Sequence, residues 1–581
     1  MNKVFPFFFF IFAFGSCCFI PNNFIDQFFL PTRGVIIIIP SFFLLFQLIT
    51  CRRLKIPIVQ LYPLVLIVLF AFIGSFNVNA EIFILLFCIA TFGFITENVS
   101  NFQSYLPLLF KGLLGLGLLN ALVGIGQFFN LVHAFHPVYK ITGFFDNSAG
   151  LAIFLASIIP LGAYLLHTAK YTTRIIIIII CGLMILTICM SGSRTGMVAV
   201  GLIVLIFICA KYDYFKRNKT LKVIFYIILL SIVPILIGLY AFKKESAEGR
   251  LFIWKVSSEM IWDSPWFGHG SESFKAKYMN YQGEYFKTHP NSKFSYLADN
   301  VKHPFNEYLK IVIEHGFVGI LAILGYIILT VILTTQLLTR EKKTALQSLL
   351  VIAIGACFSY PFSYPAINVI CALGFAILLH RSPTVSISPI YRFITLSIIT
   401  LMLVGVIYYA GAIWHWSKAD SRSAYNKPST VLNTYLELYP ILKQNGYFLY
   451  NYGYILHQSK QYRMSVSINQ EALFYINNTD LQLMLADTYA TLKQNHLAEM
   501  HYKQAYYMCP NRFMPLYGLF RLYKTANRTK EALEIAQIIV NKSEKVTTPV
   551  VGLIKMEIQQ FLKEKTDPQN CSVREGVLLD F

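Results

Sequence analysis

The sequence predicts an all-α protein: a polytopic membrane helix bundle of about 12–13 spans, with a large external loop and a C-terminal α-solenoid. Two observations predict this class. The 581 residues are 56% hydrophobic and only 13% charged, with a mean hydropathy of +0.56, whereas soluble proteins carry about 25% charged residues. The charge is also uneven, because residues 1–413 hold 30 Lys/Arg and 15 Asp/Glu, while the much shorter segment 414–581 holds 19 and 14. We therefore expect a membrane body over 1–413 and a water-exposed domain over 414–581.

The expected spans are mainly apolar segments, and a helix that crosses a bilayer needs about 20 such residues. Thirteen segments qualify: 4–20, 35–50, 57–75, 80–96, 107–131, 149–167, 175–190, 196–210, 223–241, 316–338, 346–360, 364–380 and 393–413.

The basic residues predict the orientation, because short cytoplasmic loops collect Lys and Arg. With the N-terminus in the cytoplasm, half of the body's 30 Lys and Arg fall in the cytoplasmic connections 52–55, 170–174, 211–222, 340–343 and 381–392, whereas the short external loops hold only Arg33, Lys140 and Arg194. The long loop 242–315 and the tail 414–581 then lie on the external side. The net charge of +20 is thus a topology signal, and it does not indicate a nucleic-acid partner.

The tail has a recurrence of about 34 residues, the tetratricopeptide period. Ala498 and Ala532 are one period apart, as are Tyr489 and Tyr523. Small residues allow the two helices of a unit to approach closely, and tyrosines fill the groove to the next unit. We expect about three repeats within 446–545, as either a platform for a protein partner or a domain that only stabilises the body.

Three external segments contain residues suited to catalysis. The first, Ser191–Gly196, carries Arg194 between two spans; the second opens the external loop with Arg250; the third closes the loop and contains His303. Each residue alone has an ordinary explanation, such as an arginine that reaches lipid headgroups. Their convergence on one face makes them candidates for chemistry.

Two arginines and a histidine suit the handling of a phosphorylated leaving group. Guanidinium groups bind phosphate bidentately and stay charged, and an imidazole can accept a proton from a hydroxyl near neutral pH. The sequence has no Asp-x-Asp pair, no phosphate-binding glycine loop and no zinc-type Cys/His spacing. We therefore expect no metal and no cofactor.

Four motifs in order resemble those of the O-antigen ligase superfamily, which comprises bacterial lipid A-core ligases, O-antigen polymerases and protein O-oligosaccharyltransferases. The resemblance covers the span-rich body, most specifically about 140–320. The matching segments are Gly143-Phe144-Phe145-Asp146-Asn147, Ser191-Gly192-Ser193-Arg194, the run from Gly249-Arg250 through Trp254 with Ser264-Pro265-Trp266-Phe267-Gly268-His269-Gly270, and Phe305-Asn306-Glu307-Tyr308-Leu309 with Glu314-His315-Gly316-Phe317-Val318-Gly319.

The resemblance implies a GT-C-like bundle in the bacterial inner membrane, with its C-terminal domain in the periplasm. It implies transfer of a glycan from a polyprenyl-diphosphate carrier to an acceptor hydroxyl, with inversion and without a metal. Arg194 and Arg250 would hold the diphosphate and His303 would be the base, and Asn147 and Asn306 would contribute to substrate binding. This chain departs from many members at Phe305, where they carry a histidine, so that His289 and His315 are lesser candidates for the base.

The acceptor stays open at this stage. A ligase would use lipid A-core, a polymerase a growing glycan, and an oligosaccharyltransferase a secreted protein, which an external repeat domain modestly favours. A transporter or flippase would need ionisable residues at mid-membrane and matching halves, and the spans are nearly free of charge at mid-depth. A non-catalytic scaffold would not need the two arginines and the histidine to converge.

Overall fold

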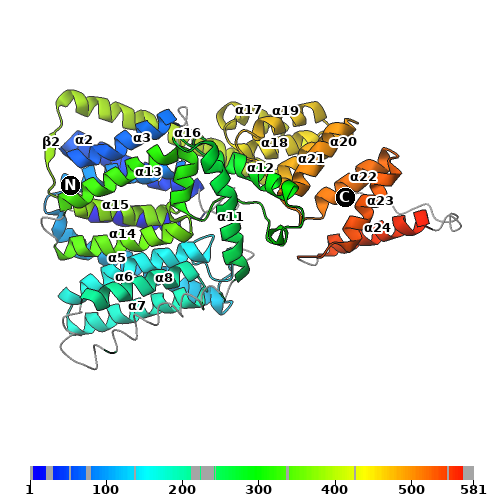
Figure 1. Cartoon of the computed structure of the whole chain (residues 1–581). Helices are drawn as coiled ribbons and strands as arrows, with labels where there is room; N and C mark the ends of the chain where they lie inside the picture. Colours follow the sequence, from blue (N-terminus) through cyan, green and yellow to red (C-terminus); the bar gives the residue numbers. More distant parts are fainter. Residues whose placement is uncertain are drawn as a thin grey trace. The chain divides into compact units, whose positions relative to one another are not determined.

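The computed structural model shown in Figure 1 is almost entirely helical. It describes residues 4–20, 30–51, 54–73, 80–135, 139–210, 223, 238, 241, 244–334, 339–423, 425, 427–545 and 548–566.

The described residues form two compact units. The first unit comprises 1–250, 257–274 and 303–422, and the second comprises 251–256, 275–302 and 423–581. Two pieces of the loop 242–315, which the basic residues predict to be external, therefore belong with the tail, and nothing in the sequence pattern indicated this membership.

Long apolar helices make up the first unit, and they confirm the expected all-α membrane bundle. Its helices are α1 (Phe5–Cys18), α2 (Leu30–Thr50), α3 (Tyr62–Ile73), α4 (Ala80–Glu97), α5 (Phe102–Phe128), α6 (Ser148–Thr168), α7 (Tyr171–Met190), α8 (Arg194–Ala210), α13 (Glu307–Thr334), α14 (Arg340–Phe358), α15 (Pro365–Leu379) and α16 (Pro389–Ser423). Seven of the described helices are long and apolar enough to cross a membrane, and four shorter helices are also apolar. Twelve of the thirteen predicted spans fall on these helices, and the remaining one, 223–241, lies outside the described residues apart from single positions.

Helix α6 lies in the interior of the bundle, where it contacts α5, α7, α8 and α14 (Figure 1). Most of its residues are buried, as expected for a helix that is apolar on all sides. Helix α7 instead exposes a row of isoleucines, including Ile175, Ile176 and Ile178. An exposed apolar surface of this kind suits contact with lipid chains.

Two short strands form a ribbon between distant parts of the first unit. Strand β1 (Lys55–Pro57) pairs antiparallel with β2 (Thr384–Ser386), with Ile56 opposite Val385. The 3-10 helix η1 (Ile58–Leu61) follows β1 directly, and Ile58 N donates to Pro383 O at 3.0 Å. The ribbon links the connections before α3 and before α16.

Helical pairs form the second unit, and their spacing has the expected period. Helices α18 (Gly446–Gln458), α20 (Thr479–Thr491) and α22 (Met514–Thr525) begin 33 and 35 residues apart, and each packs on the helix that follows it. The partners are α19 (Tyr462–Ala472), α21 (Asn495–Met508) and α23 (Thr529–Asn541), flanked by η4 (Pro428–Thr430), α17 (Leu432–Leu442) and α24 (Pro549–Thr566). The assignment of these pairs to the tetratricopeptide class stays a prediction.

Small residues allow neighbouring helices of the second unit to approach each other, both within a pair and between successive pairs. Ala486 and Ala498, on α20 and α21, are fully buried, and a Cβ on Gly518 would lie 2.2 Å from the Tyr502 ring.

The external loop adds α12 (Ser273–Thr288), most of which lies in this unit, and η2 (Lys293–Tyr296). Helix α11 (Lys244–Asp263) has residues in both units.

Candidate functional site

Tyr360 is the residue around which several of the predicted site residues gather. It lies in the turn between α14 and η3 (Pro361–Ser363), and only 8% of it is exposed. The His303 ring stacks on the Tyr360 ring with centroids 4.4 Å apart, and the Phe305 ring lies 5.7 Å from it. Asn147 Nδ2 donates to Tyr360 Oη at 2.9 Å. Three segments far apart in the sequence therefore meet at this tyrosine, which sequence reasoning did not single out.

Asn147 is held at both ends of its carboxamide. Its Oδ1 accepts from Ala149 N at 2.8 Å and so caps α6, while its Nδ2 binds Tyr360. The neighbouring Asp146 accepts a hydrogen bond from Tyr364 Oη at 2.7 Å. These contacts fix the loop before α6 against the loop before α15, so Asn147 has a structural role besides its predicted one in substrate binding.

Asn306 caps a second helix in the same region. Its Oδ1 accepts from Leu309 N at 3.0 Å, in the first turn of α13. The preceding residue, Phe305, has a φ of +54°, a conformation that bulky residues rarely adopt. The sharp turn at Phe305 separates His303 from α13 and lets its ring reach Tyr360.

Arg250 projects from α11 toward this cluster. Its Nη1 donates to Phe358 O at 2.8 Å, and its guanidinium lies over the Phe305 ring, 5.2 Å from the centroid. Burial and the nearby charge of Arg194 lower the pKa of Arg250 to about 10. Among the described residues no carboxylate forms an ion pair with Arg250. Its charge is therefore present at neutral pH and lacks a fixed counter-ion in this part of the chain.

Arg194 stands at the first position of α8, close enough to Arg250 for its charge to contribute to the lowered pKa of Arg250. Its Nη2 donates to Ser246 Oγ at 3.1 Å, which joins α8 to α11. Ser193 Oγ accepts from Gly196 N at 3.2 Å and caps the helix. Two neighbouring guanidiniums at a capped helix start are suited to hold an anion with two phosphate groups, since both the charges and the helix dipole favour it.

A break in helix α13 explains the glycine-rich motif of the external loop. At Gly316, φ is +66° and ψ is −168°, which interrupts the helix. A Cβ there would lie 2.1 Å from Trp266 O, and a Cβ on Gly268, also at positive φ, would lie 2.5 Å from the carbonyl carbon of Glu314. Only glycine combines these conformations with such close approach.

Backbone groups of the external loop replace the helix hydrogen bonds lost at this break. His269 N and Gly270 N donate to the carbonyls of Ile313 and Glu314 at 2.8 and 3.0 Å. In return, Phe317 N and Val318 N donate to the carbonyls of Pro265 and Trp266 at 2.8 and 3.1 Å. The segment 264–270 is thus built into the start of α13, immediately after the site.

Sequence reasoning missed a cluster of buried charges that contacts the 3-10 helix η3, directly after Tyr360. Lys310, in the first turn of α13, pairs with Glu81 at the start of α4, and Arg33 pairs with the same carboxylate at 2.9 Å. Ser363 Oγ donates to Glu81 Oε1 at 2.7 Å, so this network supports the turn that carries Tyr360. The three charged residues lie near helix ends and not at mid-depth. Because charged residues are rare within apolar segments, their presence there was the sequence signal that could have revealed this cluster.

The two lesser histidine candidates lie elsewhere. His315 is fully buried at the helix break, and its ring stacks on Phe70 with centroids 4.4 Å apart. His289 belongs to the second unit, where it stacks on Tyr285 at 4.6 Å. Of the three histidines, His303 is the one that lies with the predicted arginine and asparagine positions.

A comparison with protein-family models matches residues 179–324 to a family described as O-antigen ligase. The matched range is a quarter of the chain, and it contains Arg194, Arg250, His303 and the segment that fills the helix break. Searches of curated proteins and of solved structures gave no match. The family match confirms the resemblance drawn from the motifs, and it supports a multi-pass membrane enzyme of the glycosyltransferase type that acts in glycan processing.

Proposed function

Because residues 179–324 match the O-antigen ligase family, we propose that this protein transfers a glycan from a polyprenyl-diphosphate carrier to an acceptor hydroxyl. The observation that carries the proposal is the gathering of Arg250, His303 and Asn147 around Tyr360, with Arg194 close to Arg250. The two arginines supply the positive charge that a diphosphate leaving group needs, and the histidine supplies a base.

In the proposed reaction, the guanidiniums of Arg194 and Arg250 bind the diphosphate of the donor. His303 accepts the proton of the acceptor hydroxyl, and the oxygen attacks the anomeric carbon from the face opposite the diphosphate. The new carbon–oxygen bond forms as the bond to the diphosphate breaks, so the configuration inverts and polyprenyl diphosphate leaves. The arginines neutralise the charge that develops on the leaving group, which makes a metal unnecessary.

Desolvation makes Arg250 more effective in this role. Removal of its guanidinium from water lowers its pKa, which means that the charged state is less favourable than in water. A bound diphosphate supplies the missing counter-charge, and the attraction is stronger in a low-dielectric site. Binding of the donor therefore offsets part of the free-energy cost of burying Arg250.

The helix directions support the proposed topology. Asn147, Arg194 and Asn306 each stand at the N-terminal end of a helix, and the basic-residue rule places all three of these ends on the external side. The arrangement agrees with a periplasmic site, a cytoplasmic N-terminus and a periplasmic C-terminal domain in a bacterial inner membrane.

The test is a transfer assay with the purified full-length protein and a polyprenyl-diphosphate oligosaccharide. A Ser/Thr peptide, lipid A-core and a second carrier-linked glycan are offered separately, with and without EDTA. We expect transfer to one acceptor, unaffected by EDTA, and a fall of about 10²–10⁴-fold in His303→Ala, the usual contribution of a general base. The matched control is His496→Ala, which removes an exposed histidine of the second unit.

A pH series tests the role of Arg250 in binding the donor. The charged form of Arg250 binds diphosphate, so donor binding is present below its pKa and is lost as the pH rises through about 10. In Arg250→Lys, the loss should begin at lower pH, since an ammonium has a lower pKa than a guanidinium, and KM for the donor should rise. Absence of transfer to every acceptor, or unchanged transfer in His303→Ala and Arg250→Ala, would refute the proposal.

A further inference from the structure

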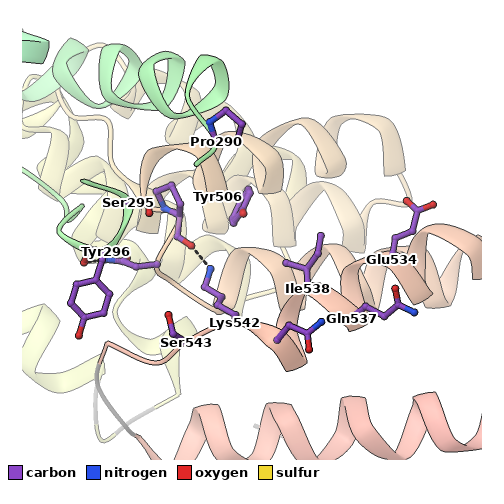
Figure 2. Close-up of a pocket in the computed structure, with 12 residues that line it drawn as sticks. Pro290, Ser295, Tyr296, Tyr506, Glu534, Gln537, Ile538, Lys542 and Ser543 are labelled. Atoms are coloured by element: carbon purple, nitrogen blue, oxygen red, sulfur yellow. Dashed lines mark hydrogen bonds between the residues drawn. The ribbon is translucent and has the colours of Figure 1, made fainter. Parts of the chain in front are cut away.

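A polar cavity in the second unit belongs to no part of the site described above. Its volume is about 710 Å³, and it is lined by one face of α23, the end of α21 and the external-loop segment 290–296 (Figure 2). All of these residues lie in the second unit. The external loop therefore forms one wall of the cavity, and the helical pairs form the other.

The wall from α23 presents a regular row of side chains. Glu534, Gln537, Ile538 and Asn541 line the cavity and stand at positions i, i+3, i+4 and i+7, so they share one face of the helix. All four are exposed. Gln537 and Asn541, whose side chains end in carboxamides, stand four residues apart, which is about 6.0 Å along the helix axis.

That spacing matches an extended polypeptide. An extended chain advances about 3.3 Å per residue, so every second residue presents its N–H and C=O on the same edge at intervals of about 6.6 Å. A carboxamide offers one acceptor and two donors and can pair with both backbone groups of one residue. Two carboxamides one helical turn apart can therefore bind the backbone of alternate peptide residues, whatever the side chains of the peptide are.

The charges of the cavity disfavour an anionic ligand. Lys542, the cation that lines it, donates to the carbonyl of Pro510 (Figure 2). It also donates to the carbonyl of Arg512 at 3.2 Å. The same ammonium lies over the Tyr506 ring, 5.2 Å from the centroid. Because these contacts already occupy Lys542 while Glu534 is exposed, a phosphate-rich lipid A-core finds little positive charge here.

Apolar groups between the carboxamides complete the surface. Ile538 is 45% exposed, and Tyr296, on the opposite wall, is 41% exposed. Pro290 and Pro510 also line the cavity. Such groups fit the uncharged side chains of a peptide whose backbone is bound by the carboxamides.

We propose that this cavity binds an extended, uncharged polypeptide segment of a secreted acceptor protein. The inference rests on the proposed function and deepens it, because it selects a protein among the three acceptor classes. The external loop would take part twice, with 290–296 at the peptide and His303 at the reacting hydroxyl.

The test measures binding by the full-length protein in detergent, without glycan transfer. The probe is a fluorescein-labelled ten-residue Ala-Ser repeat peptide, followed by fluorescence polarisation, with a neutral oligosaccharide and lipid A-core as competitors. We expect the peptide to bind and the double variant Gln537→Ala/Asn541→Ala to bind about tenfold or more weakly. Gln559→Ala, an exposed glutamine of α24 outside the cavity, should bind as the wild type does.

The outcomes separate this inference from the proposed function. His303→Ala should bind the peptide as the wild type does, although it no longer transfers glycan. Peptide binding can therefore be confirmed or refuted independently of the proposed catalytic mechanism. If the cavity binds the acceptor, the double variant should also lose glycan transfer to the peptide, while its thermal stability should be unchanged. Absence of peptide binding, equal binding by the double variant, or displacement of the peptide by the oligosaccharide or lipid A-core would overturn the inference.

Discussion

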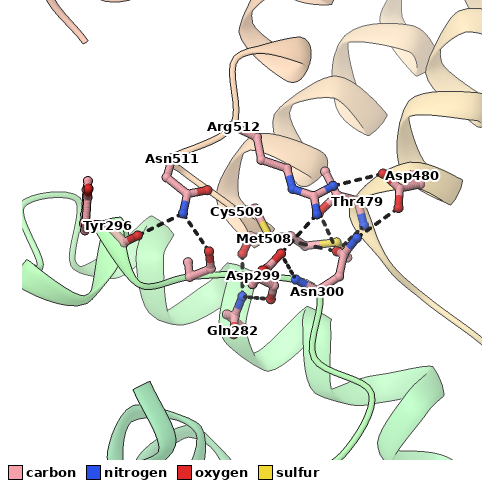
Figure 3. A network of polar contacts seen from close by, with 11 residues as sticks. Gln282, Tyr296, Asp299, Asn300, Thr479, Asp480, Met508, Cys509, Asn511 and Arg512 are labelled. Atoms are coloured by element: carbon pink, nitrogen blue, oxygen red, sulfur yellow. Dashed lines mark hydrogen bonds and ion pairs between the residues drawn. The ribbon is translucent and has the colours of Figure 1, made fainter. Parts of the chain in front are cut away.

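The two parts of the loop segment 257–302 are held in different ways. Residues 257–274 belong to the membrane unit, and their segment 264–270 is fixed by backbone hydrogen bonds to the break in α13. Residues 275–302 belong to the second unit, and polar side chains hold them to the turns between helical pairs (Figure 3), beside one backbone hydrogen bond from Asn477 N to Lys275 O at 3.0 Å. The first attachment depends on backbone shape, and the second depends on the identity of individual polar residues.

This difference determines what a substitution does in each part. Where backbone groups make the contacts, only residues with special conformations are indispensable, and those are glycines. Where side chains make the contacts, the effect depends on burial: a buried amide is costly to replace, and a partly exposed ion pair contributes little. Three substitutions test this contrast.

Gly316→Ala should have the largest effect. The new Cβ would lie 2.1 Å from Trp266 O, in a conformation that alanine does not tolerate. We expect a loss of at least about 3 kcal/mol of stability, or displacement of segment 264–270 from α13, since strain of this kind costs about 1–3 kcal/mol before any clash is counted. Thermal unfolding measures the loss of stability, hydrogen exchange at His269 N and Gly270 N measures the displacement of segment 264–270, and a glycan-transfer assay measures the effect on activity.

The matched control is Gly405→Ala in α16, where a new Cβ meets nothing within 4 Å. This variant should be unchanged or more stable by about 0.5–1 kcal/mol, because alanine favours a helix interior. Equal behaviour of the two alanine variants would show that segment 264–270 does not depend on the break.

The contrast also explains what the sequence could and could not predict. Hydropathy and basic residues located twelve of the described helices, because burial in lipid imposes a strong composition. The motifs with Arg194, Arg250 and His303 were visible because two arginines and a histidine fall on the same predicted face of the membrane. Tyr360 was not visible, since one tyrosine among 35 carries no signal until the fold brings it to His303. The docking of 275–302 was hidden for the same reason.

Gln282→Glu should have the second largest effect. The buried Gln282 Nε2 donates to Met508 O at 2.7 Å and to Asp299 O at 3.1 Å (Figure 3). A carboxylate can donate to neither carbonyl, so we expect a loss of about 2–4 kcal/mol at pH 7, the cost of a buried charge beside unsatisfied acceptors. Thermal unfolding and limited proteolysis of 275–302 in the full-length protein measure it.

The pH dependence of this variant gives a further check. Burial raises the pKa of a carboxyl group, so the variant should regain stability as the pH falls and the protonated carboxyl donates one hydrogen bond. Gln559→Glu, at an exposed position of α24 with Lys555 and Lys563 one helical turn away on either side, should not gain stability as the pH falls. A Gln282→Glu variant as stable as the wild type across the pH range would contradict the side-chain attachment.

We expect the smallest effect from substitution of Arg512. This residue lies in the turn between α21 and α22 and forms ion pairs with Asp299 of the loop and with Asp480 at the start of α20. It pairs with Asp299 at 3.1 Å and with Asp480 at 2.9 Å, and all three side chains are partly exposed (Figure 3). A double-mutant cycle of Arg512→Ala and Asp299→Ala should give a coupling energy of about 0.2–1 kcal/mol, as for other exposed pairs. The coupling should shrink at 1 M salt, where the screening length falls to about 3 Å. A coupling above about 2 kcal/mol that persists in high salt would mean that this ion pair holds the loop as firmly as the backbone contacts hold 264–270.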